Sequence, residues 1–143
     1  LDVSIRAQVV NLLMELQSRS NLSMLFISHD LSVVRRLSHR VMVLYLGRIM
    51  ELAPTAAIFA RPRHPYSLGL LRSIPRIDGK DRRLEPIPGQ PPDLSNLPAG
   101  CPFMPRCRFA TPECGLADVA LREVAPGHHS ACIRPDAVSG SAT

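Results

Sequence analysis

The chain has 143 residues, 45% of them hydrophobic and 4% aromatic, and a formal net charge of +5 at pH 7. This length allows one ordinary domain, or part of a domain with a small appendage. The positive charge is compatible with nucleic-acid binding, but so few aromatic residues leave little surface for base stacking, and helix-turn-helix or zinc-finger spacings are absent, so we predict no nucleic-acid partner.

The first predicted elements are a helix and a buried strand. Ser4 can cap a helix that runs to Ser18 and carries one apolar stripe. The segment Ser23–Ile27, which is apolar from Met24 onward, is typical of a strand buried on both faces, as in a parallel sheet. His29 follows this strand, where the ligand crevice of an open α/β sheet lies. The alternative is a plain turn in which Asp30 caps the next helix.

Alternating strands and helices continue through residue 75. A short helix is predicted over Leu31–Leu37, and a hairpin follows, with strands at Val41–Leu46 and Arg48–Leu52 and Gly47 in its turn. Two more helices are predicted, one from Pro54–Thr55 to Ala60 and one from Pro65 through Leu71. This order predicts an α/β fold for residues 1–75.

The second half has a different composition. The segment Arg76–Gly100 holds five prolines and no sustained period, so we expect an extended connector that lies back along the first half. The tail Ala137–Thr143 is small and polar and is expected to be disordered. We therefore predict a second, small, irregular Pro- and Cys-rich region over residues 76–143.

No apolar stretch is long enough to read as a membrane span. A basic-then-apolar leader is also absent, so we expect a cytosolic protein whose thiols stay reduced.

All four cysteines lie after residue 100, with five, six and 17 residues between successive members: Cys101, Cys107, Cys114 and Cys132. Their clustering in a segment poor in apolar residues suggests a staple. An iron–sulfur cluster takes four thiolates and tolerates wide loops, whereas structural zinc usually uses closer pairs, and a metal-free segment is the third possibility. His128 and His129 leave a mixed Cys and His zinc site open, although a solvated loop is the simpler interpretation for them.

Several motifs together carry a family resemblance. The stretches Leu1–Val10 and Arg40–Glu51 flank the apolar run and its histidine, and three motifs follow downstream. These are His64-Pro65-Tyr66-Ser67, Pro86-Ile87-Pro88-Gly89-Gln90-Pro91-Pro92 and Cys101-Pro102-Phe103-Met104-Pro105-Arg106-Cys107. The order resembles the second half of an ATP-binding-cassette (ABC) ATPase with the C-terminal extension of oligopeptide and dipeptide importers, from Leu1 to about Pro135.

The resemblance implies a fold, sites and partners. Residues 1–75 would be the C-terminal half of a P-loop, RecA-like nucleotide-binding domain, with Asp2 as the D-loop aspartate and His29 as the switch histidine at the γ-phosphate of ATP. It also implies Mg²⁺, transmembrane permease subunits, a second ATP-binding subunit, an extracytoplasmic solute-binding protein and a peripheral position on the cytoplasmic face of the membrane. A 4Fe–4S cluster on the four cysteines is implied as well. His39 and His64 are interpreted as surface or turn residues.

No phosphate loop is present, and the only lysine, Lys80, lacks a following hydroxyl. We therefore expect a fragment that has no ATPase activity alone, although the complete protein would be an ABC-type ATPase. The alternative function is a free-standing cysteine-rich metal-binding interaction module on an α/β scaffold.

Overall fold

The computed structural model describes residues 3–74, 85–116 and 118–139. The chain divides into two compact units, Leu1–His39 and Arg40–Thr143, and each is described by itself. Among the described residues, no helix has both the length and the apolar character that crossing a membrane requires.

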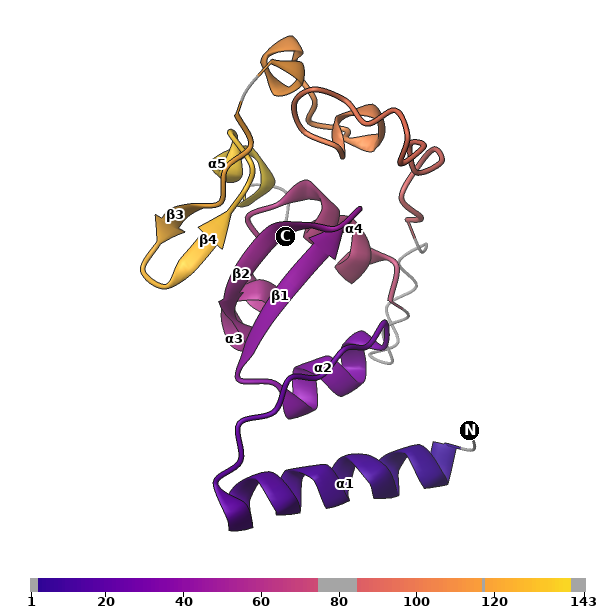
Figure 1. Ribbon diagram of the computed structural model, residues 1–143, viewed down its shortest axis with the longest axis vertical. Helices are drawn as coiled ribbons and strands as arrows, with labels where there is room; N and C mark the ends of the chain where they lie inside the picture. The colour runs from indigo at the N-terminus through magenta and orange to yellow at the C-terminus, as the bar shows by residue number, and fades with distance from the viewer. Residues whose placement is uncertain (1–2, 75–84, 117, 140–143) are drawn as a thin grey trace. The chain divides into compact units, whose positions relative to one another are not determined.

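Unit 1 contains two helices, α1 (Val3–Ser20) and α2 (Leu31–Leu37) (Figure 1). Both predicted helices are confirmed, and α2 begins as expected, because the Asp30 carboxylate accepts hydrogen bonds from the backbone N–H of Ser32 and Val33 at 3.0 and 3.3 Å. Arg36 of α2 donates to the Asn11 side chain of α1 at 3.1 Å. The apolar stripe expected on α1 is largely uncovered, since Val9 and Leu12 are 49% and 55% exposed.

The predicted buried strand over Ser23–Ile27 is wrong for this structure. Residues 22–28 belong to no helix or strand, and Leu25 and Ile27 are each 90% exposed. A strand of this kind is buried only when neighbouring strands pair with both of its edges and helices cover both faces. The described residues supply no such neighbours for this segment.

A β-hairpin opens unit 2. Strands β1 (Arg40–Tyr45) and β2 (Arg48–Pro54) pair antiparallel, and buried and exposed residues alternate along β1. Leu46 and Gly47 both have positive φ, 49° and 76°, which gives a two-residue turn whose twist matches that of the strands. The predicted hairpin is therefore confirmed within one or two residues at each end.

Helices α3 (Thr55–Ala60) and α4 (Pro65–Arg72) follow β2 where they were predicted. Pro65 is the first residue of α4, where a missing backbone N–H costs nothing. His64 caps this helix through its ring.

The second half of the sheet was not predicted from the sequence. Strands β3 (Arg122–Ala125) and β4 (His128–Ser130) extend it to four antiparallel strands in the order β1-β2-β4-β3 (Figure 1). The fold is therefore mixed α and β, as predicted, although its sheet is small, open and antiparallel. His128 and His129 lie in β4 rather than in a solvated loop, so that interpretation was wrong.

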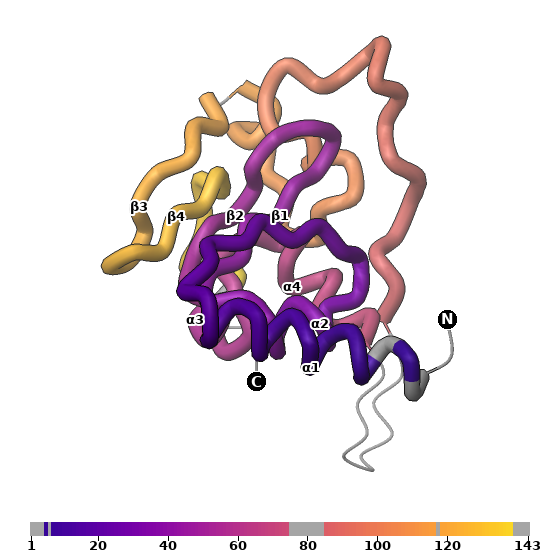
Figure 2. Tube along the Cα trace, turned by 60° about the horizontal axis from the view of Figure 1, so that its bottom comes forward, coloured from indigo at the N-terminus to yellow at the C-terminus, as the bar shows by residue number. Residues whose placement is uncertain are grey.

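The remaining chain of unit 2 contains short turns of helix: η1 (Met104–Arg106), η2 (Pro112–Gly115) and α5 (Pro135–Ser139). Residues 85–100 have no helix or strand, and Figure 2 shows the segment from residue 85 onward looping past the tip of the β1–β2 hairpin. The disorder expected from Ala137 is wrong for the described part of the tail, because Val138 lies in α5 and is fully buried. Residues 140–143 lie outside the described residues.

Three aromatic rings centre the core of unit 2. Phe103 packs edge-on against Tyr45 and tilted against Tyr66, with ring centroids 5.4 and 5.3 Å apart, and Met50 completes the cluster. Ile87 of the proline-rich segment packs on the same cluster. The downstream segment is thus held on the hairpin and α4 by a small aromatic core.

Candidate functional site

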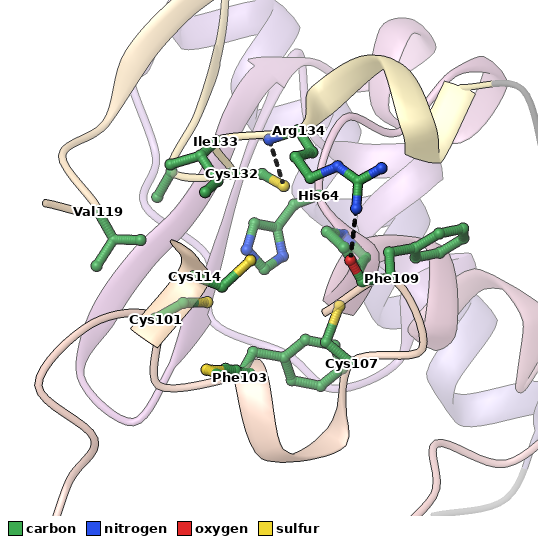
Figure 3. Close-up of a pocket in the computed structure, with 13 residues that line it drawn as sticks. His64, Cys101, Phe103, Cys107, Phe109, Cys114, Val119, Cys132, Ile133 and Arg134 are labelled. Carbon is green, nitrogen blue, oxygen red and sulfur yellow. Dashed lines mark hydrogen bonds between the residues drawn. The ribbon is translucent and has the colours of Figure 1, made fainter. Parts of the chain in front are cut away.

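The four cysteines, although spread over 32 positions of sequence, line one pocket (Figure 3). Its cavity is about 20 Å³, and its wall is largely apolar. In Figure 3 the His64 ring lies in the middle of the view with the cysteine sulfur atoms around it. The four cysteines therefore border the same cavity, and their predicted role as metal ligands stays a prediction.

Tight turns place the first three cysteines. Cys101 N–H donates to the Cys114 carbonyl at 2.8 Å, and Cys107 N–H closes η1 by donating to Met104 at 3.1 Å. Gly100 allows its backbone to lie against the backbone of Cys114 and Gly115. An added Cβ would clash with the Cys114 carbonyl and lie 2.6 Å from the Gly115 carbonyl carbon. The local backbone thus fixes Cys101 beside Cys114.

The fourth cysteine comes from the far end of the chain. Ala131 N–H donates to the Met50 carbonyl at 2.9 Å, which continues the pairing of β4 with β2 up to Cys132. Cys132 N–H donates to Ser130 Oγ at 3.2 Å, and Arg134 N–H donates to Cys132 Sγ at 3.4 Å. Pairing of β4 with β2 therefore positions Cys132 at the pocket.

All four cysteines are free thiols and partly buried. Burial raises the pKa of Cys132 to about 11, and it also raises the pKa of Cys101 and Cys107, with the neighbouring thiols adding to each shift. A metal ion that binds these sulfur atoms as thiolates would displace their protons to solvent.

The residues that line the cavity match a thiolate-bound metal in chemistry but not in spacing. The donors fit, since four thiols face one cavity and thiolates favour zinc or iron–sulfur centres. However, no three Cys, His, Asp or Glu side chains of the described residues lie close enough to hold an ion as they stand. A metal ion would therefore be held only if the thiol side chains turned toward one another.

A buried carboxylate ties the elements around this pocket together. Glu51 of β2 is fully buried and accepts from the backbone N–H of Arg63 at 2.6 Å and of His64 at 3.1 Å. Its Oε1 also lies 2.6 Å from His128 Nε2 of β4. We call Glu51, Arg63, His64 and His128 the Glu51 clasp, and it holds β2, β4 and the start of α4 to one another.

His64 is the member of the clasp that also lines the cysteine pocket. It is 1% exposed, lines the cysteine pocket, and accepts a hydrogen bond from Tyr66 N–H on Nδ1 at 3.1 Å. Burial lowers the pKa of His64 to about 3, so the ring is neutral. The interpretation of His64 as a surface or turn residue was wrong about its exposure, since it is a buried cap.

The residues predicted at the nucleotide are His29 and Asp2. His29 is exposed, directly before the Asp30 cap of α2, and Asp2 lies outside the described residues. The structure therefore leaves their predicted roles untested. His39 is exposed at the end of unit 1.

Residues 50–114 match the family described as the C-terminal region of oligopeptide/dipeptide transporters. This range includes most of β2, the clasp residues Glu51, Arg63 and His64, and three of the four cysteines. A peptide import ATP-binding protein of Brucella ovis is 54% identical over 136 residues, covering 94% of this chain and 43% of its own length. Residues 50–114 of the chain belong to this transporter family.

Further relatives agree. Peptide import ATP-binding proteins of Brucella abortus and Brucella melitensis are each 47% identical over 140 residues, with 94% of this chain and 41% of their own length covered. The chain spans about two fifths of the length of the curated relatives it matches. The similarity extends across both structural units.

Sequence reasoning found the four cysteines but missed the clasp. Glu51 carried a weak signal, as a carboxylate between the apolar residues Met50 and Leu52. His64 carried another, as the residue before a proline at a helix start. His128 gave no signal, because its burial depends on pairing between strands 77 residues apart.

Proposed function

We propose that this chain works as the C-terminal part of the ATP-binding subunit of an importer of oligopeptides or dipeptides. The observation that carries the proposal is the 47–54% identity to peptide import ATP-binding proteins over 94% of the chain. Similarity over both units favours this function over a free-standing metal-binding module, which would need only the cysteine region.

In the complete protein, His29 would donate to the γ-phosphate of ATP and Asp2 would couple two nucleotide sites across a dimer of ATP-binding subunits. ATP and Mg²⁺ would be held largely by residues that this chain does not supply, since it has no phosphate loop. Closure of the dimer would drive permease subunits, with the protein peripheral on the cytoplasmic face of the membrane and peptides delivered by a solute-binding protein.

The decisive experiment is His29→Ala in the complete protein. Loss of one charge-stabilising donor at the transition state typically costs on the order of 100-fold in rate, so turnover should fall by about that factor while nucleotide affinity changes little. His39→Ala is the matched control, because His39 is also an exposed histidine of unit 1. Turnover near wild type in the His29 variant would contradict the assignment.

We further propose that Cys101, Cys107, Cys114 and Cys132 ligate one 4Fe–4S cluster with a structural role. The support is the all-thiol donor set around one cavity and the wide spacing of the cysteines, which suits a cluster better than structural zinc. When bound, the cluster would crosslink the 101–114 loop to the end of β4.

Anaerobic purification of the complete protein tests this second proposal. The protein should be brown and contain iron and sulfide, and changing any one of the four cysteines to serine should remove the colour. Colourless protein with stoichiometric zinc would replace the cluster by a zinc site. Metal-free protein that resists proteolysis between residues 100 and 132 would contradict both.

A further inference from the structure

One polar atom at the cysteine pocket has no partner. His64 Nε2 is buried and makes no hydrogen bond with any described residue. A buried donor without an acceptor is costly, so such an atom in a folded protein calls for an explanation. His64 also lines the cavity that the four cysteines line, so an acceptor bound there would lie beside the ring.

The helix cap determines which nitrogen carries the proton. Nδ1 accepts from Tyr66 N–H at 3.1 Å, so Nδ1 has no hydrogen of its own. A neutral imidazole must then carry its hydrogen on Nε2. His64 thus presents an N–H donor, and no acceptor, at the pocket.

The ring is also held in place. The Glu51 carboxylate fixes the His64 backbone through a 3.1 Å hydrogen bond, and the Phe103 ring lies 6.0 Å from the imidazole, centroid to centroid. A donor oriented in this way needs no rearrangement of its own backbone to meet an acceptor. Thiolate and sulfide sulfur atoms are the acceptors that a loaded four-cysteine site would bring here.

We propose that His64 is a positioning residue that donates its Nε2–H to a sulfur atom of the thiolate-bound metal centre. The inference rests on the proposed metal centre. The donor offsets part of the negative charge of the thiolates and so favours the loaded state. The same residue thereby couples the start of α4 to the occupancy of the pocket.

Two variants separate the two functions of this side chain. His64→Asn keeps an N-cap acceptor but is too short to supply the ε-position donor, and His64→Gln keeps a donor near that position but is a poor cap. His39→Asn controls for a histidine change at an exposed position in unit 1. Circular dichroism of each variant in the complete protein checks that it folds.

The measurement is metal retention. Each protein is reconstituted anaerobically with ferrous iron and sulfide, or separately with zinc, and then challenged with a chelator. His64→Asn should lose either metal about 10-fold or more readily than wild type, since groups that hydrogen-bond metal ligands typically contribute 10- to 100-fold to affinity. His64→Gln and His39→Asn should stay within about 3-fold of wild type on the same scale.

The outcomes distinguish this inference from the metal centre itself. If wild type loads and His64→Asn retains metal equally well, the His64 donor is overturned and the centre stands. If wild type loads neither metal, the centre fails and the donor fails with it. Nitrogen-15 NMR of wild type provides a test free of mutation, because an Nδ1–H tautomer of His64 would also overturn the inference.

Discussion

Unit 1 and unit 2 use their apolar residues in opposite ways. In unit 1, the apolar stripe of α1 and the run at 22–28 are largely exposed, and only Val10, Val34 and Leu37 are buried hydrophobic residues among those described. In unit 2, a segment rich in prolines and short turns nevertheless folds around Tyr45, Met50 and Phe103. The stronger apolar pattern thus belongs to the less buried unit.

The difference shows that an apolar period predicts burial only where a partner surface exists. The run at 22–28 needs strands on both sides, whereas unit 2 closes on itself through β2–β4 pairing and the Glu51 clasp. A few aromatic contacts and the hydrogen-bonded Glu51 carboxylate therefore hold together a region that its composition predicts to be irregular.

The largest expected difference between the two units comes from a pair of substitutions that each shorten one apolar side chain to alanine. Phe103→Ala removes a ring that is 3% exposed and touches Tyr45 and Tyr66, so it should lower the free energy of unfolding of unit 2 by about 3–5 kcal/mol. Tyrosine fluorescence during urea unfolding reports unit 2 alone, because Tyr45 and Tyr66 are the only tyrosines and the chain has no tryptophan.

Ile27→Ala is the matched change in unit 1. Ile27 is 90% exposed, so its loss should change stability by no more than about 0.5 kcal/mol, measured by circular dichroism. A cost comparable to that of Phe103→Ala would show that residues 22–28 are buried in solution.

The Glu51 clasp should be the next largest contribution. Glu51→Ala leaves two backbone N–H groups and His128 without their acceptor, which should destabilise unit 2 by about 3 kcal/mol in the same urea experiment. Glu15→Ala in α1 removes an exposed pair with Arg19 and should cost about 0.5 kcal/mol or less. Equal effects would mean that the clasp is not formed.

The cysteine loop gives a smaller effect. Gly100→Ala should cost about 1–3 kcal/mol, because the added Cβ meets backbone atoms of Cys114 and Gly115 that cannot move away easily. Gly115→Ala is the control, since its Cβ would meet only the flexible Met104 side chain, 3.2 Å from Sδ. Alkylation of the metal-free thiols should be faster in Gly100→Ala than in Gly115→Ala, and similar rates would contradict the close approach.

Apart from the control substitutions, the smallest expected effect is in unit 1. Asp30→Ala removes the cap of α2 and should cost about 1 kcal/mol, seen as a loss of helical circular dichroism on warming. Asp30→Asn should be nearly neutral, because an asparagine oxygen caps equally well. An Asn variant as unstable as the Ala variant would show that another interaction of Asp30 matters more.

The sequence determined the elements whose signals are local. Asp30 before α2, Gly47 in the hairpin turn and Pro65 at the start of α4 each act through a backbone requirement met within a few residues. The grouping of four cysteines after residue 100 likewise marked the candidate site without any structure.

Only the tertiary structure decided which residues surround that site. Glu51, His64 and His128 are polar residues of three separate segments, and each is buried because the other segments satisfy or enclose it. The same dependence on distant partners left the Ser23–Ile27 run exposed. A polar group or a central strand is buried only when segments distant in the sequence pack against it. Local sequence patterns do not show which segments those are.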